Sequence, residues 1–175
     1  MKHDRSFFKE SIKSWKDNRS NNKDGDSVAW CHGSAGIGLG RLLFEQYHED
    51  SRINEELTMV RDNILNILDG TNSQCICHGD LGNLEILLAI AYRNKDDDTL
   101  NIVNNYLKFL CNEFLENKNF IYGTEGKTDI LGLFLGKAGF GYQLLRFCDW
   151  ENVPSVMCLE IPNNLNKILH EKTIF

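Results

Sequence analysis

The sequence predicts an all-α fold built from stacked helical hairpins. Only two prolines occur among 175 residues, so long helices are easily accommodated. Residues 53–68 and 99–116 carry apolar side chains at the spacing of an amphipathic helix. A glycine motif recurs three times, at intervals that suit a pair of helices and their loops. Strand patterns are weak throughout, and the best of them covers residues 153–159.

Length and composition bound the class of protein. A chain of 175 residues suits one domain and can bury roughly two-thirds of its unfolded surface. The net charge of −6 argues against a nucleic-acid partner, which would require a basic face, and is compatible with a neutral or basic peptide. Because no apolar run approaches the roughly 20 residues of a membrane span and residues 1–16 lack a signal-peptide core, we expect a cytoplasmic protein with no integral membrane segment.

The elements are expected in the following order. Residues 1–24 should form a helix and a polar loop that lead into the domain, with four apolar side chains on one side of that helix: Phe7, Phe8, Ile12 and Trp15. The helix over residues 53–68 should end at Asp69-Gly70, since glycine readily adopts the left-handed conformation of a helix end. A second amphipathic helix follows a polar run and covers residues 99–116. Residues 161–175 are expected to form a tail.

The three glycine motifs share the pattern Gly-x-x-Gly and run into apolar stretches. They read His32-Gly33-Ser34-Ala35-Gly36, His78-Gly79-Asp80-Leu81-Gly82 and Leu135-Gly136-Lys137-Ala138-Gly139, with steps of 46 and 57 residues. Paired glycines at the start of a helix allow it to pack close to a neighbour. We therefore expect three apolar inner helices surrounded by the longer amphipathic helices, with a ring that stays incomplete and leaves exposed edges.

Two of these motifs carry the same tripeptide in the same register, Cys31-His32-Gly33 and Cys77-His78-Gly79. If the repeats are related by rotation, both tripeptides reach the same end of the ring. Thiolate and imidazole are the preferred ligands of zinc, and six cysteines in a cytoplasmic chain favour metal or catalytic roles over disulfides. The competing interpretation is two inert buried cysteines beside hydrogen-bonded histidines.

These motifs resemble the lanthionine synthetase C-like family, and most closely the C-terminal part of the cyclase domain of class II lanthionine synthetases. The resemblance covers about residues 25–160. It is carried by Trp30-Cys31-His32-Gly33, Gly36-Ile37-Gly38-Leu39, Cys77-His78-Gly79-Asp80-Leu81-Gly82-Asn83, Gly139-Phe140-Gly141-Tyr142 and Val153-Pro154-Ser155-Val156. It implies a partial α/α toroid and one zinc ion (Zn²⁺) held by Cys31, Cys77 and His78. The fourth position would then be open to water or a substrate thiolate.

The resemblance also implies an activity, the addition of a cysteine thiolate to dehydroalanine or dehydrobutyrine in a ribosomally made precursor peptide, which closes (methyl)lanthionine rings. Residues 1–175 would form the C-terminal part of such a cyclase domain. The family's acid–base histidine is expected upstream, so no catalytic residue is assigned in this chain. A truncated or split enzyme is expected, with a missing N-terminal half or a dehydratase as a further partner.

Other interpretations stay open. His32 would complete a closed Cys₂His₂ site, and Cys75 is either a spare thiol beside that site or a loop residue without a role. The remaining cysteines, Cys111, Cys148 and Cys158, are expected in the core. Asp80 is expected to cap the helix that follows it. The alternative function is a non-catalytic helical-repeat module that binds a peptide or protein, with structural zinc or none.

Overall fold

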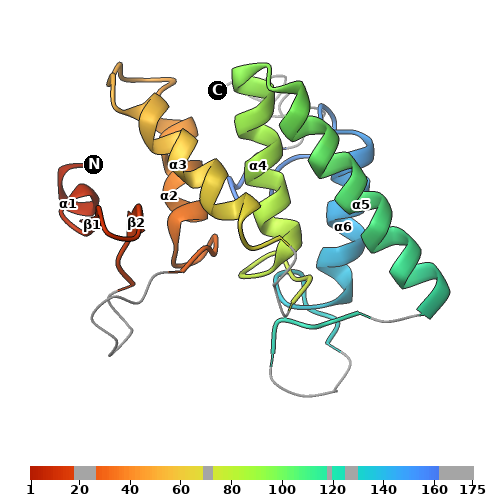
Figure 1. The fold of residues 1–175 in the computed structure, drawn as a ribbon. Coiled ribbons are helices and arrows are strands. Elements are labelled where there is room, and N and C mark those ends of the chain that lie inside the picture. The colour runs from red at the N-terminus through yellow and green to blue at the C-terminus, as the bar shows by residue number, and fades with distance from the viewer. Residues whose placement is uncertain (18–26, 69–72, 118–119, 125–129, 162–175) are drawn as a thin grey trace, which may run out of the picture.

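The structure, a computed structural model, describes residues 1–17, 27–68, 73–117, 120–124 and 130–161 (Figure 1). Six helices and one two-stranded hairpin occur in these residues, which confirms the all-α class. In chain order the elements are α1 (Lys2–Arg5), β1 (Phe8–Lys9), β2 (Ser14–Trp15), α2 (Ser34–Phe44), α3 (Ile53–Leu65), α4 (Asp80–Asn94), α5 (Asp97–Asn117) and α6 (Lys137–Cys148).

The inner helices α2, α4 and α6 form an arc, with α4 between the other two and in contact with both (Figure 1). The outer helix α3 packs on α2 and α4, and the outer helix α5 packs on α4. Accordingly α4 is buried around most of its circumference, whereas α3 buries a single face. The fold is therefore a partial α/α toroid whose inner helices are the three that begin with Gly-x-x-Gly.

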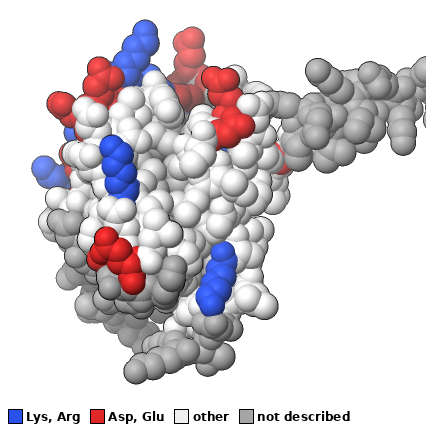
Figure 2. All heavy atoms as spheres, turned by 90° about the vertical axis from the view of Figure 1, so that its right-hand side faces the viewer, with Lys and Arg blue, Asp and Glu red and all other residues white. Residues whose placement is uncertain are grey.

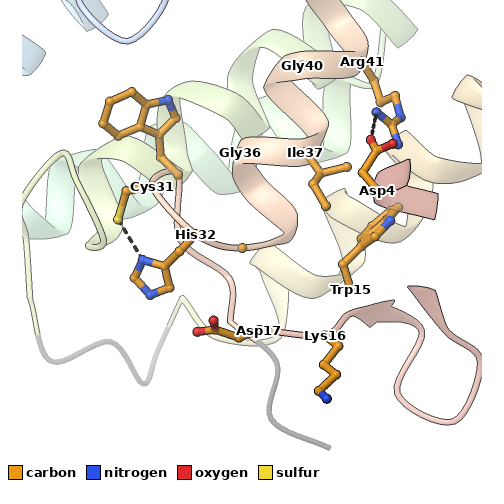
Figure 3. A pocket seen from close by; sticks show the side chains of 12 residues that line it. Asp4, Trp15, Lys16, Asp17, Cys31, His32, Gly36, Ile37, Gly40 and Arg41 are labelled. Atoms are coloured by element: carbon orange, nitrogen blue, oxygen red, sulfur yellow. Dashed lines mark hydrogen bonds and ion pairs between the residues drawn. The ribbon is translucent and has the colours of Figure 1, made fainter. Parts of the chain in front are cut away.

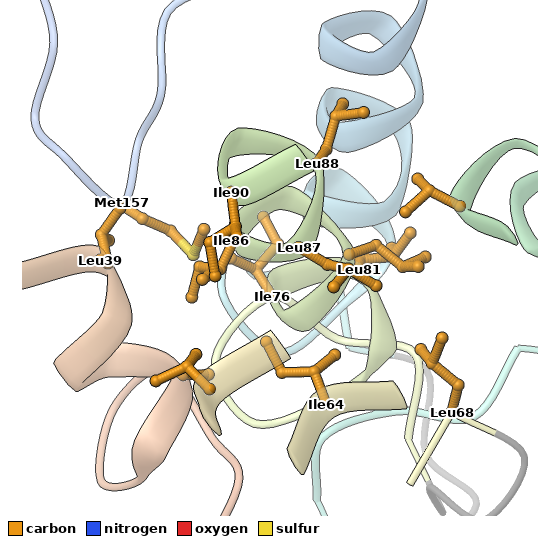
Figure 4. Close-up of a cluster of buried hydrophobic side chains, with 14 of the residues drawn as sticks. Leu39, Ile64, Leu68, Ile76, Leu81, Ile86, Leu87, Leu88, Ile90 and Met157 are labelled. Atoms are coloured by element: carbon orange, nitrogen blue, oxygen red, sulfur yellow. The ribbon is translucent and has the colours of Figure 1, made fainter. Parts of the chain in front are cut away.

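The hydrophobic core lies between these helices and is centred on α4 (Figure 4). Leu39 reaches it from α2 and Ile64 from α3, while Ile76 enters from the loop that precedes α4. Ile64 and Ile76 are fully buried, as are five side chains of α4: Leu81, Leu84, Ile86, Leu87 and Ile90. Burial of such a side chain stabilises a fold by about 1.5–3 kcal/mol, so the core fixes how the loops at the helix starts are presented.

The loops that lead into the three inner helices fold alike. The first helical N–H donates to the carbonyl seven residues earlier in each, with distances of 2.9 Å at Ser34, 3.0 Å at Asp80 and 2.8 Å at Lys137. One of the amides that every helix start leaves without an intrahelical partner is thereby satisfied. The second glycine of each motif touches the carbonyl six residues before it, so a Cβ at Gly36 or Gly82 would collide with backbone.

The N-terminal prediction was wrong in its type of element. The expected helix through Phe7, Phe8, Ile12 and Trp15 is replaced by the short α1 and an antiparallel hairpin, in which Phe8 pairs with Trp15. Lys13 has φ 48°, which turns the chain between the two strands. Residues seven apart share a helix face and also oppose each other in this hairpin, so the apolar spacing did not distinguish the two.

Two further expectations differ in detail. Residues 153–159 form turns rather than a strand, and Leu159 has φ 54°. The helix expected to end at Asp69-Gly70 ends earlier, at Leu65 with Asn66 as its C-cap, and residues 69–70 lie outside the described part of the chain. The second amphipathic helix begins at Asp97, where Asp96 accepts a 3.0 Å hydrogen bond from the Thr99 amide and so caps it.

An ion-pair network centred on the buried Glu56 and Arg41 attaches α1 to α2 and α3. Glu56 pairs with Arg5 and with Arg41, each at 2.5 Å, and Arg41 also pairs with Asp4 at 2.6 Å. Asp50 accepts from Arg5 at 2.6 Å. Burial alone would raise the pKa of Glu56, but the hydrogen bonds from Arg5 and Arg41 hold it below its usual value. The N-terminal segment is therefore anchored by charge as well as by packing.

The side of the molecule formed by α5 and α6 carries few charges. The face seen in Figure 2 is largely uncharged, with acidic and basic residues interspersed mainly along its upper edge. Large apolar side chains are exposed on these two helices, at Ile102, Phe109, Leu115 and Leu145. Exposed apolar edges of this kind are what an arc of three inner helices predicts.

The close approach at Gly82 predicts a large effect of one methyl group. We expect Gly82→Ala to lower the free energy of unfolding by about 1–3 kcal/mol, because the Ile76 carbonyl occupies the place of the new Cβ. Gly141→Ala, on a helix position with open space, should instead raise it by up to about 1 kcal/mol. Urea titration followed by circular dichroism measures both, and equal effects of the two substitutions would contradict the packing argument.

The network around Glu56 predicts that substitution of Glu56 lowers the free energy of unfolding at neutral pH more than at acidic pH. Glu56→Gln should destabilise the fold by about 1.5–3 kcal/mol at pH 7, because Arg41, only 3% exposed, would lose one of its two carboxylate partners. The folded-state pKa of Glu56 is lowered, so its contribution is present at neutral pH and is lost as the pH falls below the unfolded value of about 4.3. The exposed neighbour Glu55, changed to Gln, is the control. A difference between the two variants that is as large at pH 3 as at pH 7 would contradict this assignment.

Candidate metal centre

The two Cys-His-Gly loops meet at one end of the inner helices. The Cys31 amide donates to the Cys77 carbonyl at 3.3 Å, and the Cys77 amide donates to the Phe134 carbonyl at 3.0 Å. These three residues occupy the same place in the three repeats, two positions before the first glycine of each motif. The backbone therefore links equivalent points of successive repeats, and this link brings the two cysteines together.

The sulfurs of Cys31 and Cys77 and an imidazole nitrogen of His78 lie within 4.8 Å of one another. Donor atoms around one tetrahedral zinc ion are about 3.5–3.8 Å apart, so small side-chain movements would bring this set to coordination distance. Cys31 is exposed, whereas Cys77 and His78 are half-buried. The arrangement thus offers soft donors of the type that zinc prefers, with access from the Cys31 side.

His32 lies beside this donor set. Its Nδ1 is 2.8 Å from the Cys31 sulfur, and the imidazole and the thiol face each other in Figure 3. The three-residue donor group itself comprises Cys31, Cys77 and His78. His32 therefore contacts one of the donor atoms directly. The two residues are neighbours in the sequence, but the sequence alone did not predict this contact.

Cys75 is buried and does not belong to the donor set. Its side chain is 1% exposed, and its sulfur accepts a 3.5 Å hydrogen bond from the His78 amide. The thiol also packs against Gly123, where an added Cβ would lie 2.7 Å from the sulfur. Cys75 thus shapes the loop that presents Cys77 and His78, which is a structural role rather than that of a spare thiol.

Asp80 follows the second motif directly and is nearly buried. It is the first residue of α4, whose N-cap is Gly79, so it is not the N-cap that the sequence suggested. Its carboxylate accepts a 2.9 Å hydrogen bond from the Tyr106 hydroxyl of α5. Burial raises the pKa of Asp80 to about 7, and the bond from Tyr106 offsets part of that rise. The carboxylate therefore connects the outer helix α5 to the start of α4.

The remaining cysteines lie elsewhere and were only partly anticipated. Cys148 is exposed at the end of α6, so the expectation that it belongs to the core was wrong. Cys111 and Cys158 are half-buried. Burial raises the pKa of both thiols, which makes them poorer candidates for metal ligands than the loop cysteines.

A pocket of about 520 Å³ opens beside the donor set (Figure 3). Cys31 and His32 lie at one end of it and Arg41 at the other, and Trp30 also lines it. Trp30 also stacks on Phe134, with ring centroids 5.4 Å apart and planes at 3°, so this tryptophan serves packing and pocket at once. Sequence reasoning missed Phe134, although its place in the third repeat, equivalent to the two cysteines, is a readable signal.

Comparison with known proteins agrees with these features. The family model described as lanthionine synthetase C-like protein matches residues 1–158. Over 145 residues the chain is 32% identical to a protein described as lacticin 481/lactococcin biosynthesis protein LcnDR2, from Lactococcus lactis subsp. lactis. That match covers 75% of this chain and 15% of the relative, so the chain spans a small part of that protein's length.

None of the helices in the described parts of the chain is long and apolar enough to cross a membrane. The repeated glycine loops, the paired Cys-His-Gly motifs and the match over residues 1–158 all lead to one assignment. The chain belongs to the lanthionine synthetase C-like family.

Proposed function

We propose that this chain serves in zinc-dependent cyclisation of a ribosomally made peptide, with Cys31, Cys77 and His78 holding one zinc ion. The observation that carries the proposal is the convergence of these three soft donors from two separate repeats. Family membership and the likeness to a protein named for lacticin 481 biosynthesis support the same reaction class. The proposed product is a lanthionine or methyllanthionine ring.

The chemistry follows from the donor set. When bound, zinc would lower the pKa of a substrate thiol and hold it as a nucleophile in the position that three protein ligands leave open. A new S–C bond then forms at the β-carbon of dehydroalanine or dehydrobutyrine, the electron pair of the C=C bond moves into an enolate, and a proton is added at the α-carbon. One proton leaves the thiol and one proton is added at the α-carbon, so the reaction needs no oxidant or reductant.

The residues of this chain position the two motif loops and leave the donor set accessible to a substrate. The Cys31–Cys77 backbone bond fixes the distance between the two motif loops, and buried Cys75 orients the loop that carries His78. Exposure of Cys31 leaves one side of the site open to a peptide. We propose that a further part of a cyclase delivers the proton to the enolate and that a dehydratase supplies the dehydrated peptide.

The donor set predicts the metal content. Native mass spectrometry of the purified protein at neutral pH should show one zinc ion per chain. Cys31→Ala, Cys77→Ala and His78→Ala should each weaken zinc affinity by at least about 100-fold, since even partners of ligands cost 10–100-fold. Cys111→Ala, on the outer helix α5, should keep its zinc and is the matched control. Full zinc content in the Cys31 and Cys77 variants would refute the site.

Because His32 lies outside the three-residue donor group, we predict that the fourth coordination position of the zinc is open. His32→Ala should retain one zinc ion, with affinity lowered by about 10–100-fold at most, because His32 contacts the Cys31 sulfur but lies outside the three-residue donor group. A loss as large as that of Cys31→Ala would make His32 a fourth ligand. The site would then be structural, and the alternative function, a peptide-binding helical module, would be favoured.

A further inference from the structure

The pocket beside the candidate metal centre follows one face of α2. Its lining includes Gly33, Gly36, Ile37, Gly40 and Arg41, which follow the pattern i, i+3, i+4, i+7 and i+8 and so share a side of the helix. From Gly33 to Arg41 the helix rises about 12 Å, the length of three or four extended residues. Figure 3 shows this face running from Cys31 and His32 at one end to Arg41 at the other.

Packing does not require a glycine at position 40 of this face. Gly36 is required because the Trp30 carbonyl lies against it, and Gly38 because Val60 does, but nothing lies within 4 Å of a Cβ placed at Gly40. A glycine inside a helix costs about 1 kcal/mol relative to alanine. The absence of a side chain at Gly40 therefore weakens the helix, and its one visible effect is to keep the pocket open.

The chemistry of the lining selects the kind of occupant. Its charged residues balance, with Lys16 and Arg41 against Asp4 and Asp17, so the pocket favours no net charge. Trp30 and Ile37 supply apolar walls. Arg41 is 3% exposed, and its guanidinium already pairs with Asp4 and Glu56, so it closes that end of the pocket without offering an unpaired charge.

We infer that the glycine face of α2 binds the peptide segment next to the reacting cysteine, as an extended chain with an uncharged, apolar side chain between Trp30 and Ile37. The inference rests on the proposed function, because it places the substrate cysteine at the Cys31 end. It adds a preference for sequence around the ring-forming cysteine, set by a helix surface rather than by the metal ligands.

The test compares two helix glycines with open space. Gly40→Leu fills the pocket, and Gly141→Leu changes the exposed face of α6 as a matched control. The probes are blocked pentapeptides with a central cysteine followed by phenylalanine or by aspartate, titrated by calorimetry into the full chain with zinc content recorded. We expect Gly40→Leu to weaken binding of the phenylalanine peptide at least tenfold and Gly141→Leu to change it less than twofold. The aspartate peptide should bind the wild type at least tenfold more weakly.

Each outcome decides between the two proposals. Equal affinity of Gly40→Leu and wild type, equal affinity for both peptides, or no wild-type binding at millimolar peptide overturns the inference, even if zinc is present. If the wild type lacks zinc but still distinguishes the two peptides and the variants, the inference about the groove stands and the metal proposal is overturned. The melting temperature of Gly40→Leu should not fall below that of the wild type, and Gly40→Ala, with a smaller loss of binding, tests the same point if leucine perturbs the fold.

Discussion

The backbone bonds that join equivalent residues of the three repeats are the constraint on which the site depends. The Cys31 amide bonds to the Cys77 carbonyl, and the Cys77 amide bonds to the Phe134 carbonyl. Residues 46 or 57 positions apart in the chain are thereby held in register without any metal. Separating these loops would break both backbone bonds, so the bonds hold the donor atoms near one another.

The helices supply the rigidity behind this contact. Packing of α2, α4 and α6 in an arc, with α4 almost wholly buried, fixes the direction of each helix start. The Gly-x-x-Gly pairs then let each loop fold back on its own helix, which a larger side chain would block. The site thus depends on close backbone packing first and on side-chain identity second, as expected for functional loops placed by a rigid scaffold.

Much of this could be predicted from the sequence. Apolar spacing indicated the outer helices α3 and α5, and the repeated glycines indicated the inner ones, because both signals are local. The repeated Cys-His-Gly tripeptide indicated the two loops, and the resemblance to the family selected the three donor residues, which the structure brings together. The N-terminal hairpin was mistaken for a helix because the spacing of Phe8 and Trp15 fits both, and only the turn at Lys13 separates them. The contacts of His32 with Cys31 and of Trp30 with Phe134 depend on side-chain rotamers and loop approach, which no periodicity encodes.

Phe134 carries a consequence for the symmetry of the site. Three equivalent loops surround the meeting point, yet sulfur is present in two of them and an aromatic ring in the third. Phe134 and Leu135 stand in the third loop where the other two loops carry cysteine and histidine, and Trp30 stacks on the Phe134 ring. The third loop therefore supplies packing at the place where the other two supply donor atoms. A threefold repeat of the backbone thus carries a donor set that comes from two loops only.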